Sequence, residues 1–155
     1  MRRYDREVTD FEEIVEIISR CDVIRIGFSE DGIPYIVPLN FAYEANDGQI
    51  TFFFHSAAKG KKIDIIKKNP YVCFELDRFK IISDKIPCKW SAEYESIIGY
   101  GKIHFIDHYD EKKSAMDLIM KRYGFEGNCE YSPEVFSRTV LYKLSVNKIT
   151  GKRNT

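Results

Sequence analysis

The chain has 155 residues, of which 24 are Lys or Arg and 24 are Asp or Glu, and it is 44% hydrophobic and 14% aromatic. This length suits one folded domain with a sizeable core, so we expect residues 1–155 to form a single domain. The balanced charge gives no reason to expect a nucleic-acid or anionic-membrane partner, and the apolar content argues against disorder. No apolar run is long enough to span a membrane, and the charged start lacks the apolar segment of a secretory signal, so the default expectation is a cytoplasmic protein.

The N-terminal part of the chain predicts a charged lead-in followed by a helix. Thr9-Asp10-Phe11-Glu12 matches the capping-box pattern, in which Thr9 accepts from the first-turn amides and Glu12 reaches back. An apolar stripe then continues at helical spacing as far as Cys21. We therefore expect a helix over about 10–20.

The next segment predicts two strands. Alternating apolar residues favour a strand over 23–28, and a turn leads into a second strand over 33–44. Pro34 suits the start of that strand and Pro38 suits an edge or a bulge, because proline has no N–H to donate to a sheet ladder. A bulge beside Leu39-Asn40 would leave backbone groups free to bind something other than another strand.

A hairpin and a short helix come next. Asn46-Asp47-Gly48 is a strong hairpin signal, so we expect the second strand and the aromatic strand 50–54 to be antiparallel neighbours. The aromatic strand ends at His55. Apolar residues then recur at helical spacing until Asn69-Pro70 ends the helix, because the residue before a proline avoids helical angles.

Two lysines stand at the start of this helix. Unpaired N–H groups point out of a helix N-terminus, and Lys61 and Lys62 add two cations beside them, which makes a plausible anion site. From spacing alone a lysine cluster is more often a solvated face, and a single histidine such as His55 is more often structural than catalytic. Gly60 lacks the flanking glycines of the G-x-x-x-x-G-K-[ST] loop, so a nucleoside triphosphate site is not supported.

The second half of the chain supplies the remaining elements. Apolar runs predict three more strands, over 71–82, 94–106 and 140–147. Two helices are expected between the last two strands, over 107–123 and from Ser132. Gly99 and Gly101 interrupt the long strand, and a glycine there marks either ordinary sheet curvature or a place where another group, such as a flat ring, approaches the backbone.

Metal and thiol chemistry have little support. The four cysteines show no C-x-x-C pair and are expected to be reduced thiols; they are Cys21, Cys73, Cys88 and Cys129. His104 and His108 are four residues apart but span a strand-to-helix junction, so we assign both to the surface. We expect no metal site.

Six largely hairpin-connected strands with helices between them predict a mainly β fold, an antiparallel barrel with helices packed at its ends and flank. The sequence contains no G-x-S-x-G, H-E-x-x-H or Rossmann motif. An enzyme without its own nucleophile or metal can still act if a cofactor supplies the reactive atom.

Several segments along the chain carry a family resemblance. They are Arg2-Arg3-Tyr4-Asp5-Arg6-Glu7, Val37-Pro38-Leu39-Asn40-Phe41, Phe54-His55-Ser56-Ala57 followed by Gly60-Lys61-Lys62-Ile63-Asp64, Asn69-Pro70-Tyr71-Val72-Cys73-Phe74, Tyr94-Glu95-Ser96-Ile97-Ile98-Gly99-Tyr100-Gly101-Lys102 and Ile149-Thr150-Gly151-Lys152. In this order they resemble the nitroimidazole-resistance (Nim-type) branch of the pyridoxamine 5′-phosphate oxidase-like flavin-binding split barrels. The resemblance implies a six-stranded antiparallel split β-barrel that binds FMN.

The resemblance also implies which residues hold the cofactor. Lys61 and Lys62 match the basic positions that bind the FMN phosphate. The other implied positions are the backbone of Val37, Pro38, Leu39 and Asn40 beside the flavin ring, His55 and Ser56 near the ribityl chain or ring, and Ser96 on the long strand. Such proteins are usually homodimers with two flavin sites at the interface, so each site would take residues from both chains.

The function that the resemblance implies is an FMN-dependent oxidoreductase that passes electrons or hydride to a small-molecule acceptor, such as a nitroaromatic 5-nitroimidazole. His55 is the candidate for proton delivery, since histidine titrates near neutral pH. Two alternatives stay open: a non-catalytic carrier or sensor that binds flavin or haem, and a cofactor-free dimeric interaction module. No nicotinamide-binding fingerprint is present, so the sequence leaves the electron donor open.

Overall fold

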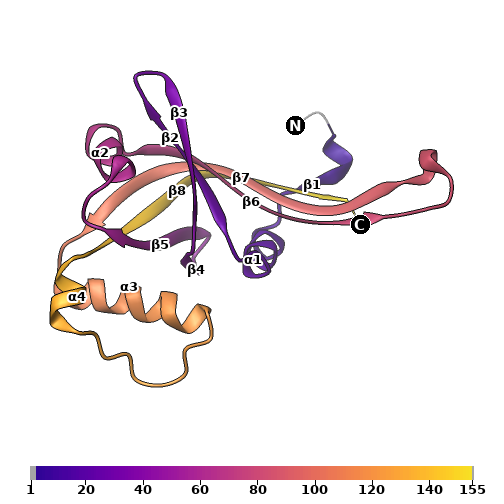
Figure 1. The fold of residues 1–155 in the computed structure, drawn as a ribbon. Coiled ribbons are helices and arrows are strands. Elements are labelled where there is room, and N and C mark those ends of the chain that lie inside the picture. Colours follow the sequence, from indigo (N-terminus) through magenta and orange to yellow (C-terminus); the bar gives the residue numbers. More distant parts are fainter. Residues whose placement is uncertain (1–2, 155) are drawn as a thin grey trace.

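The computed structural model describes residues 3–154, and its framework is one antiparallel sheet that bends round a core (Figure 1). The strands are β1 (Glu7–Val8), β2 (Ile24–Glu30), β3 (Ile33–Leu39), β4 (Ala42–Asn46), β5 (Gln49–Ala57), β6 (Tyr71–Ile82), β7 (Ser91–Ile106) and β8 (Thr139–Asn154). The helices are α1 (Phe11–Ser19), α2 (Lys61–Lys68), α3 (Tyr109–Arg122) and α4 (Pro133–Ser137), with 3₁₀ turns at Tyr4–Arg6 and Pro87–Lys89. The strand order is β3-β2-β6-β7-β8-β5-β4, and β1 pairs with β8. The prediction of a mainly β antiparallel fold with flanking helices is confirmed.

The sheet is not closed, as expected for a split barrel. Its two end strands, β3 and β4, follow one another in the chain but do not pair in the part of the chain that the structure describes. The single strand predicted over 33–44 is therefore wrong in its middle, because the chain breaks at Asn40 and Phe41. With β4 and the short β1, the sheet has eight strands rather than six.

The end of α3 holds this break in place. The Phe41 N–H donates to the Tyr123 hydroxyl at 3.0 Å, and that hydroxyl donates to the Asp22 carbonyl at 2.7 Å. The Arg122 guanidinium lies 4.3 Å from the centroid of the buried Phe41 ring. Since the Phe41 amide is bonded to a side chain rather than a strand, the sheet ladder stops there.

Two further features were predicted from local sequence signals, the β4–β5 hairpin correctly and the cap of α1 incorrectly. The hairpin between β4 and β5 is confirmed: Asn46 pairs with Gln49, and Asp47 and Gly48 both have positive φ, as the two-residue turn requires. The capping prediction at Thr9 is wrong by one residue. The cap of α1 is Asp10, whose side chain accepts from the Glu13 N–H at 3.0 Å, because aspartate is an equally good cap and stands one position later.

Two apolar clusters lie on opposite sides of the sheet. The first lies on the inner side and includes the isoleucines of α1 and α2 with Phe52 and Phe54 of β5. The second lies between the outer side of the sheet and helices α3 and α4, and includes Phe53 and Phe136. Because β5 alternates between the two clusters, each strand residue can be assigned to the inner or outer face by its pairing.

The two longest strands carry the sheet beyond its body. β6 and β7 continue as a hairpin arm that extends well past the core (Figure 1). β8 pairs with β7 as far as Asn154, with an irregularity between Tyr100 and Gly101, so it is longer than the predicted 140–147. The polar residues after Val146 do not alternate with apolar ones, which is why the pattern missed them. Among residues 3–154 no helix has the length and apolar character that crossing a membrane requires.

The two glycines of the long strand make room for the chain itself. Gly99 faces inward beneath the Phe74 ring, and a Cβ on it would lie 2.7 Å from the Lys148 carbonyl oxygen. A Cβ on Gly101 would lie 2.7 Å from the Leu144 side chain. Both glycines therefore serve sheet packing on the inner face, and the space beside Gly99 holds no additional ring.

Gly99→Ala should lower the free energy of unfolding by about 1–3 kcal/mol, because the new methyl group overpacks against Phe74 and the Lys148 carbonyl. Gly27→Ala is the matched control, since its Cβ would meet nothing closer than the Cys73 carbonyl oxygen at 3.6 Å. Urea unfolding of both variants measures the difference. Equal midpoints would contradict the packing described for Gly99.

Candidate functional site

The candidate site begins where β5 ends. Phe53 belongs to the outer cluster and Phe54 to the inner cluster, so alternation places His55 on the outer face and Ser56 on the inner face. The chain then turns through Ala57–Gly60 into α2. His55 and Ser56 therefore present different chemistry to the two sides of one strand end.

The start of α2 has no side-chain cap. Its cap residue is Gly60, whose φ of +140° lies in a region that favours glycine. The N–H groups of Ile63 and Asp64 both donate to the Gly60 carbonyl, at 2.9 and 3.2 Å. The N–H groups of Lys61 and Lys62 precede the first helical acceptor and remain available for an anion.

The two lysines differ in their surroundings. The Lys61 ammonium lies 4.7 Å from the centroid of the Tyr35 ring, which ties the start of α2 to β3. Lys62 is half-buried, and burial lowers its pKa. Neither lysine takes part in any ion pair formed within residues 3–154, and the exposed Asp64 is the acidic residue of the first turn. The charge of Lys62 is thus partly desolvated without a paired carboxylate.

His55 is electrostatically linked to Lys62. Desolvation lowers the pKa of His55 first, although part of its side chain stays exposed, and the positive charge of Lys62 lowers it further. Both effects disfavour the charged imidazolium in the chain alone. An anion bound between the two residues would act in the opposite direction and raise the pKa of His55.

A buried phenol lies near Ser56. The Tyr142 hydroxyl is fully buried and has no hydrogen-bond partner within residues 3–154. Burial raises the pKa of Tyr142, and the neighbouring Ser56 offsets part of that effect, while the Ser56 hydroxyl itself donates to the Ala57 carbonyl at 3.1 Å. Sequence analysis missed Tyr142, because alternation identifies it only as an inward residue. Its unpaired hydroxyl is the kind of group that a ligand or water satisfies.

The residues predicted to lie beside the flavin ring, Val37 to Asn40, are at the end of β3, on an open edge of the sheet. Val37 and Leu39 pack half-buried against the inner cluster, whereas Pro38 and Asn40 are exposed. β3 pairs only with β2 in the described sheet, so its other backbone edge has no strand partner. The expectation that Pro38 suits an edge is confirmed, and the role of these backbone groups in binding a cofactor stays a prediction.

Ser96 lies far from the other predicted site residues. It pairs with Asp77 and Lys152 on the outer face of β7. His55 pairs with Leu141, which in turn pairs with Ile106. Ser96 and Ile106 are ten residues apart along β7, which is about 33 Å of chain at the usual rise per strand residue. One chain therefore brings together His55, Ser56, Lys61 and Lys62, but not Ser96.

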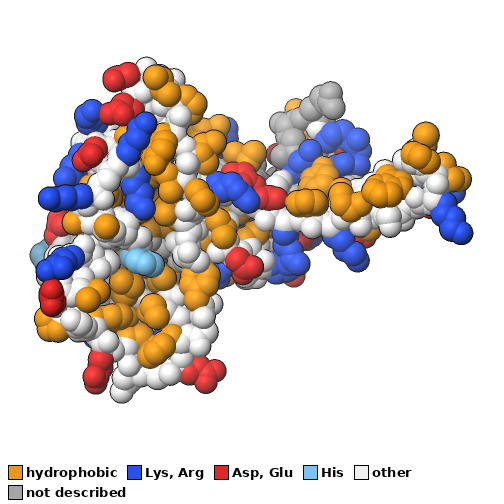
Figure 2. Space-filling model, in the orientation of Figure 1, with side chains coloured by type: hydrophobic (Ala, Val, Ile, Leu, Met, Phe, Trp, Pro, Cys, Tyr) orange, Lys and Arg blue, Asp and Glu red, His pale blue; other side chains and the backbone are white. Residues whose placement is uncertain are grey.

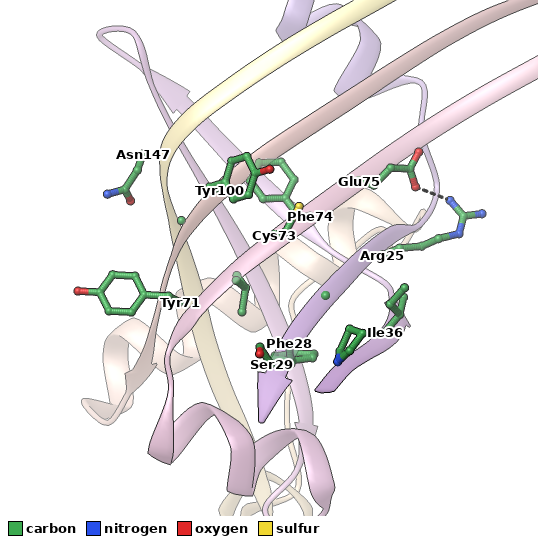
Figure 3. A pocket seen from close by; sticks show the side chains of 14 residues that line it. Arg25, Phe28, Ser29, Ile36, Tyr71, Cys73, Phe74, Glu75, Tyr100 and Asn147 are labelled. Atoms are coloured by element: carbon green, nitrogen blue, oxygen red, sulfur yellow. Dashed lines mark hydrogen bonds and ion pairs between the residues drawn. The ribbon is translucent and has the colours of Figure 1, made fainter. Parts of the chain in front are cut away.

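A hollow on the outer face of the described sheet holds none of the predicted site residues (Figure 3). It measures about 740 Å³ and lies over β3, β2, β6 and β7. Ile36, Tyr71 and Tyr100 line it, and the Arg25–Glu75 ion pair, at 3.1 Å, stands at one side. Sequence analysis missed this hollow, although apolar residues at alternate strand positions, such as Tyr71 and Cys73, were an available signal.

Comparisons with known proteins identify the class. The family model described as pyridoxamine 5′-phosphate oxidase matches residues 10–153. The crystal structure of a candidate 5-nitroimidazole antibiotic resistance protein from Bacteroides thetaiotaomicron has a TM-score of 0.82 and 33% identity, covering 95% of this chain and 86% of that one. No curated protein matches this chain.

More distant structures share the fold. The flavocytochrome Anf3 from Azotobacter vinelandii has a TM-score of 0.83 at 16% identity, covering 100% of this chain and 72% of that one. The FAD and heme binding protein from Mycobacterium smegmatis has a TM-score of 0.74 at 14% identity, covering 96% and 73%. The open antiparallel sheet and its flanking helices thus define a split barrel of the flavin-binding class. Within that class, the chain belongs to the pyridoxamine 5′-phosphate oxidase family.

Lys62→Gln should raise the pKa of His55, because the substitution removes the positive charge that disfavours the imidazolium. Lys67→Gln, on the exposed last turn of α2, is the control and should leave that pKa unchanged. Titration of the His55 ring protons by NMR, in protein free of cofactor, measures both. An identical pKa in the Lys62→Gln variant and the parent protein would refute the coupling.

Proposed function

We propose that this chain is an FMN-dependent oxidoreductase, working as a homodimer with flavin at the interface, that reduces a small acceptor such as a nitroaromatic 5-nitroimidazole. The observation that carries the proposal is the start of α2, where Lys61 and Lys62 flank free N–H groups beside His55. Membership of a flavin-binding family supports it.

The chemistry of the start of α2 fits a phosphate monoester. Such a group carries about −1.5 to −2 charges near neutral pH and presents three strong acceptor oxygens. Lys62 is half-buried, with no carboxylate paired to it within residues 3–154, so an anion would compensate a charge that the fold leaves partly desolvated. Ser56 and the unpaired Tyr142 hydroxyl add polar groups on the inner side. This set favours FMN over riboflavin, which lacks the phosphate.

Bound FMN would supply the electron or hydride transfer. The residues of this chain would bind the phosphate, offer the open β3 edge at Val37–Asn40 to the ring, and exclude water. His55 would deliver a proton to an oxygen of the reduced nitro group. A phosphate near Lys62 would raise the pKa of His55 toward the range in which histidine serves as an acid.

Lys62→Ala should weaken FMN binding about tenfold or more, since a charge-assisted hydrogen bond contributes roughly 1.5–3 kcal/mol, and it should leave riboflavin binding little changed. Lys67→Ala is the control on the same helix. Quenching of flavin fluorescence gives both dissociation constants. FMN binding as tight as that of the parent protein would overturn the phosphate assignment.

His55→Ala with FMN bound should slow the oxidation of pre-reduced flavin by a 5-nitroimidazole about 100-fold, the lower range for loss of a general acid. His104→Ala, an exposed histidine on β7, should react like the parent protein. Anaerobic stopped-flow absorbance follows the reaction. An unchanged rate in His55→Ala would make His55 structural only.

The second candidate function is a non-catalytic carrier or sensor that binds flavin or haem. Two structural neighbours, a flavocytochrome and an FAD and heme binding protein, favour testing it. The absorption spectrum of the purified protein, followed by mass identification of the released cofactor, separates FMN from FAD and haem. A bound flavin that no nitroaromatic reoxidises anaerobically faster than free flavin would favour the carrier.

A further inference from the structure

The Tyr142 side chain is fixed within the inner core while its hydroxyl stays unpaired. The residue is 0% exposed, its ring stacks on Phe54 at a centroid distance of 5.4 Å, and it forms an edge-to-face contact with Phe105 at 6.3 Å. The hydroxyl has no hydrogen-bond partner within residues 3–154. An unpaired buried hydroxyl costs stability, and phenylalanine would fill the same space without that cost. The core itself therefore gains nothing from the oxygen of Tyr142.

Ser56 is the polar neighbour of this hydroxyl. Ser56 pairs with Val140, and Phe54 pairs with Tyr142, so Ser56 and Tyr142 are diagonal neighbours on the inner face, a separation that an aromatic side chain can span. Burial raises the pKa of Tyr142, and the Ser56 hydroxyl is close enough to offset part of this effect. The Ser56 hydroxyl nevertheless donates to the Ala57 carbonyl, at 3.1 Å. Because Ser56 is half-buried, its hydroxyl lies between the sealed phenol and the surface.

The strand end that carries Ser56 leads directly into the start of α2. The Lys61 ammonium lies over the ring of Tyr35, which packs against the inner cluster, so the start of α2 adjoins the inner side as well as His55. Several Lys and Arg side chains lie over the end of the body that holds α2 (Figure 2). A chain of atoms that continues inward from a phosphate held at Lys61 and Lys62 would therefore pass Ser56.

We propose that Tyr142 is a positioning residue for this site: its hydroxyl donates to the Ser56 oxygen and so directs the Ser56 hydroxyl to an oxygen of a polyol chain attached to the bound phosphate. The inference rests on the proposed function and deepens it, because the ribityl chain of FMN is such a polyol. Rotation about the Ser56 Cα–Cβ bond makes the exchange. The Ala57 carbonyl then bonds to water, since Ala57 is exposed, while Tyr142 gains an acceptor and the ligand gains a donor.

The surroundings of the two hydroxyls favour a neutral oxygen over a second anion. Both cations of the site stand at the start of α2, whereas the Tyr142 hydroxyl is enclosed by the rings of Phe54 and Phe105 and by other residues of the inner cluster. A charged group would be poorly solvated there, but a hydroxyl needs only a single donor or acceptor. The site should therefore select a phosphate ester whose chain carries hydroxyl groups over one whose chain is a plain alkane.

Unfolding of the cofactor-free protein by urea tests the state of the Tyr142 hydroxyl. Tyr142→Phe should unfold at the same urea concentration as the parent protein or a higher one, because it removes an unpaired buried group. Tyr43→Phe is the control, since Tyr43 is a half-buried tyrosine of the same cluster without a buried unpaired hydroxyl, and it should keep the parent midpoint. A clearly lower midpoint for Tyr142→Phe would mean that the hydroxyl is already paired in the core, which overturns the proposal.

Binding of two phosphate esters tests the role of the hydroxyl. Ribitol 5-phosphate and pentyl phosphate carry the same anionic group on carbon chains of equal length, but only the first has chain hydroxyls. Isothermal titration calorimetry gives the ratio of their dissociation constants. The preference for the ribitol ester should fall about threefold to tenfold in Tyr142→Phe, the contribution of roughly one neutral hydrogen bond, and Tyr43→Phe should keep the parent ratio.

A double variant shows whether Tyr142 acts through Ser56. Ser56→Ala should lose the same preference, and adding Tyr142→Phe to it should cause no further loss. Additive losses, an unchanged preference in Tyr142→Phe, or a parent protein that binds neither ester or does not distinguish them would each overturn the proposal. No flavin or redox step enters these measurements. Failure to reduce a nitroaromatic would therefore leave the result intact, and FMN could still bind through Lys62 if the Tyr142–Ser56 pair had no role.

Discussion

The register of β7 between β6 and β8 determines most of what this protein presents to its surroundings. It directs Gly99 and Gly101 inward, where only glycine leaves room for Phe74 and the β8 backbone. The alternate residues Tyr94, Ser96, Ile98 and Tyr100 therefore face outward. A shift of one residue would exchange the two faces, so that Ser96 would enter the core and Ile97 would face outward. The glycines thus fix the register by steric exclusion, and the register in turn defines the apolar outer face.

Electrostatics at the start of α2 is the second constraint. The fold partly buries Lys62, leaves the helix without a side-chain cap and places His55 close enough for the two charges to oppose each other. Each of these features is unfavourable in the isolated chain. A bound anion would relieve all three at once, which is the physical reason that we propose a binding site at this helix start.

The sequence predicted the elements whose signals are local. Asn46-Asp47-Gly48 encodes its own turn, and Asn69-Pro70 ends α2 at the expected place. A bulge was expected beside Leu39-Asn40, but the break of the strand at Asn40 and Phe41 was not predicted, because its cause, the Tyr123 hydroxyl, lies 82 residues away in sequence. The full length of β8 was missed because its polar second half is held by pairing with β7 rather than by burial. The Lys61–Lys62 cluster was found from sequence, whereas the unpaired Tyr142 hydroxyl depends on three-dimensional packing.

The distance between Ser96 and His55 decides how a shared site can be built. His55 lies across β8 from Ile106, and Ile106 and Ser96 are ten residues apart along β7, a strand held in place by its pairing with β8. If both residues serve one cofactor, the second must come from another chain.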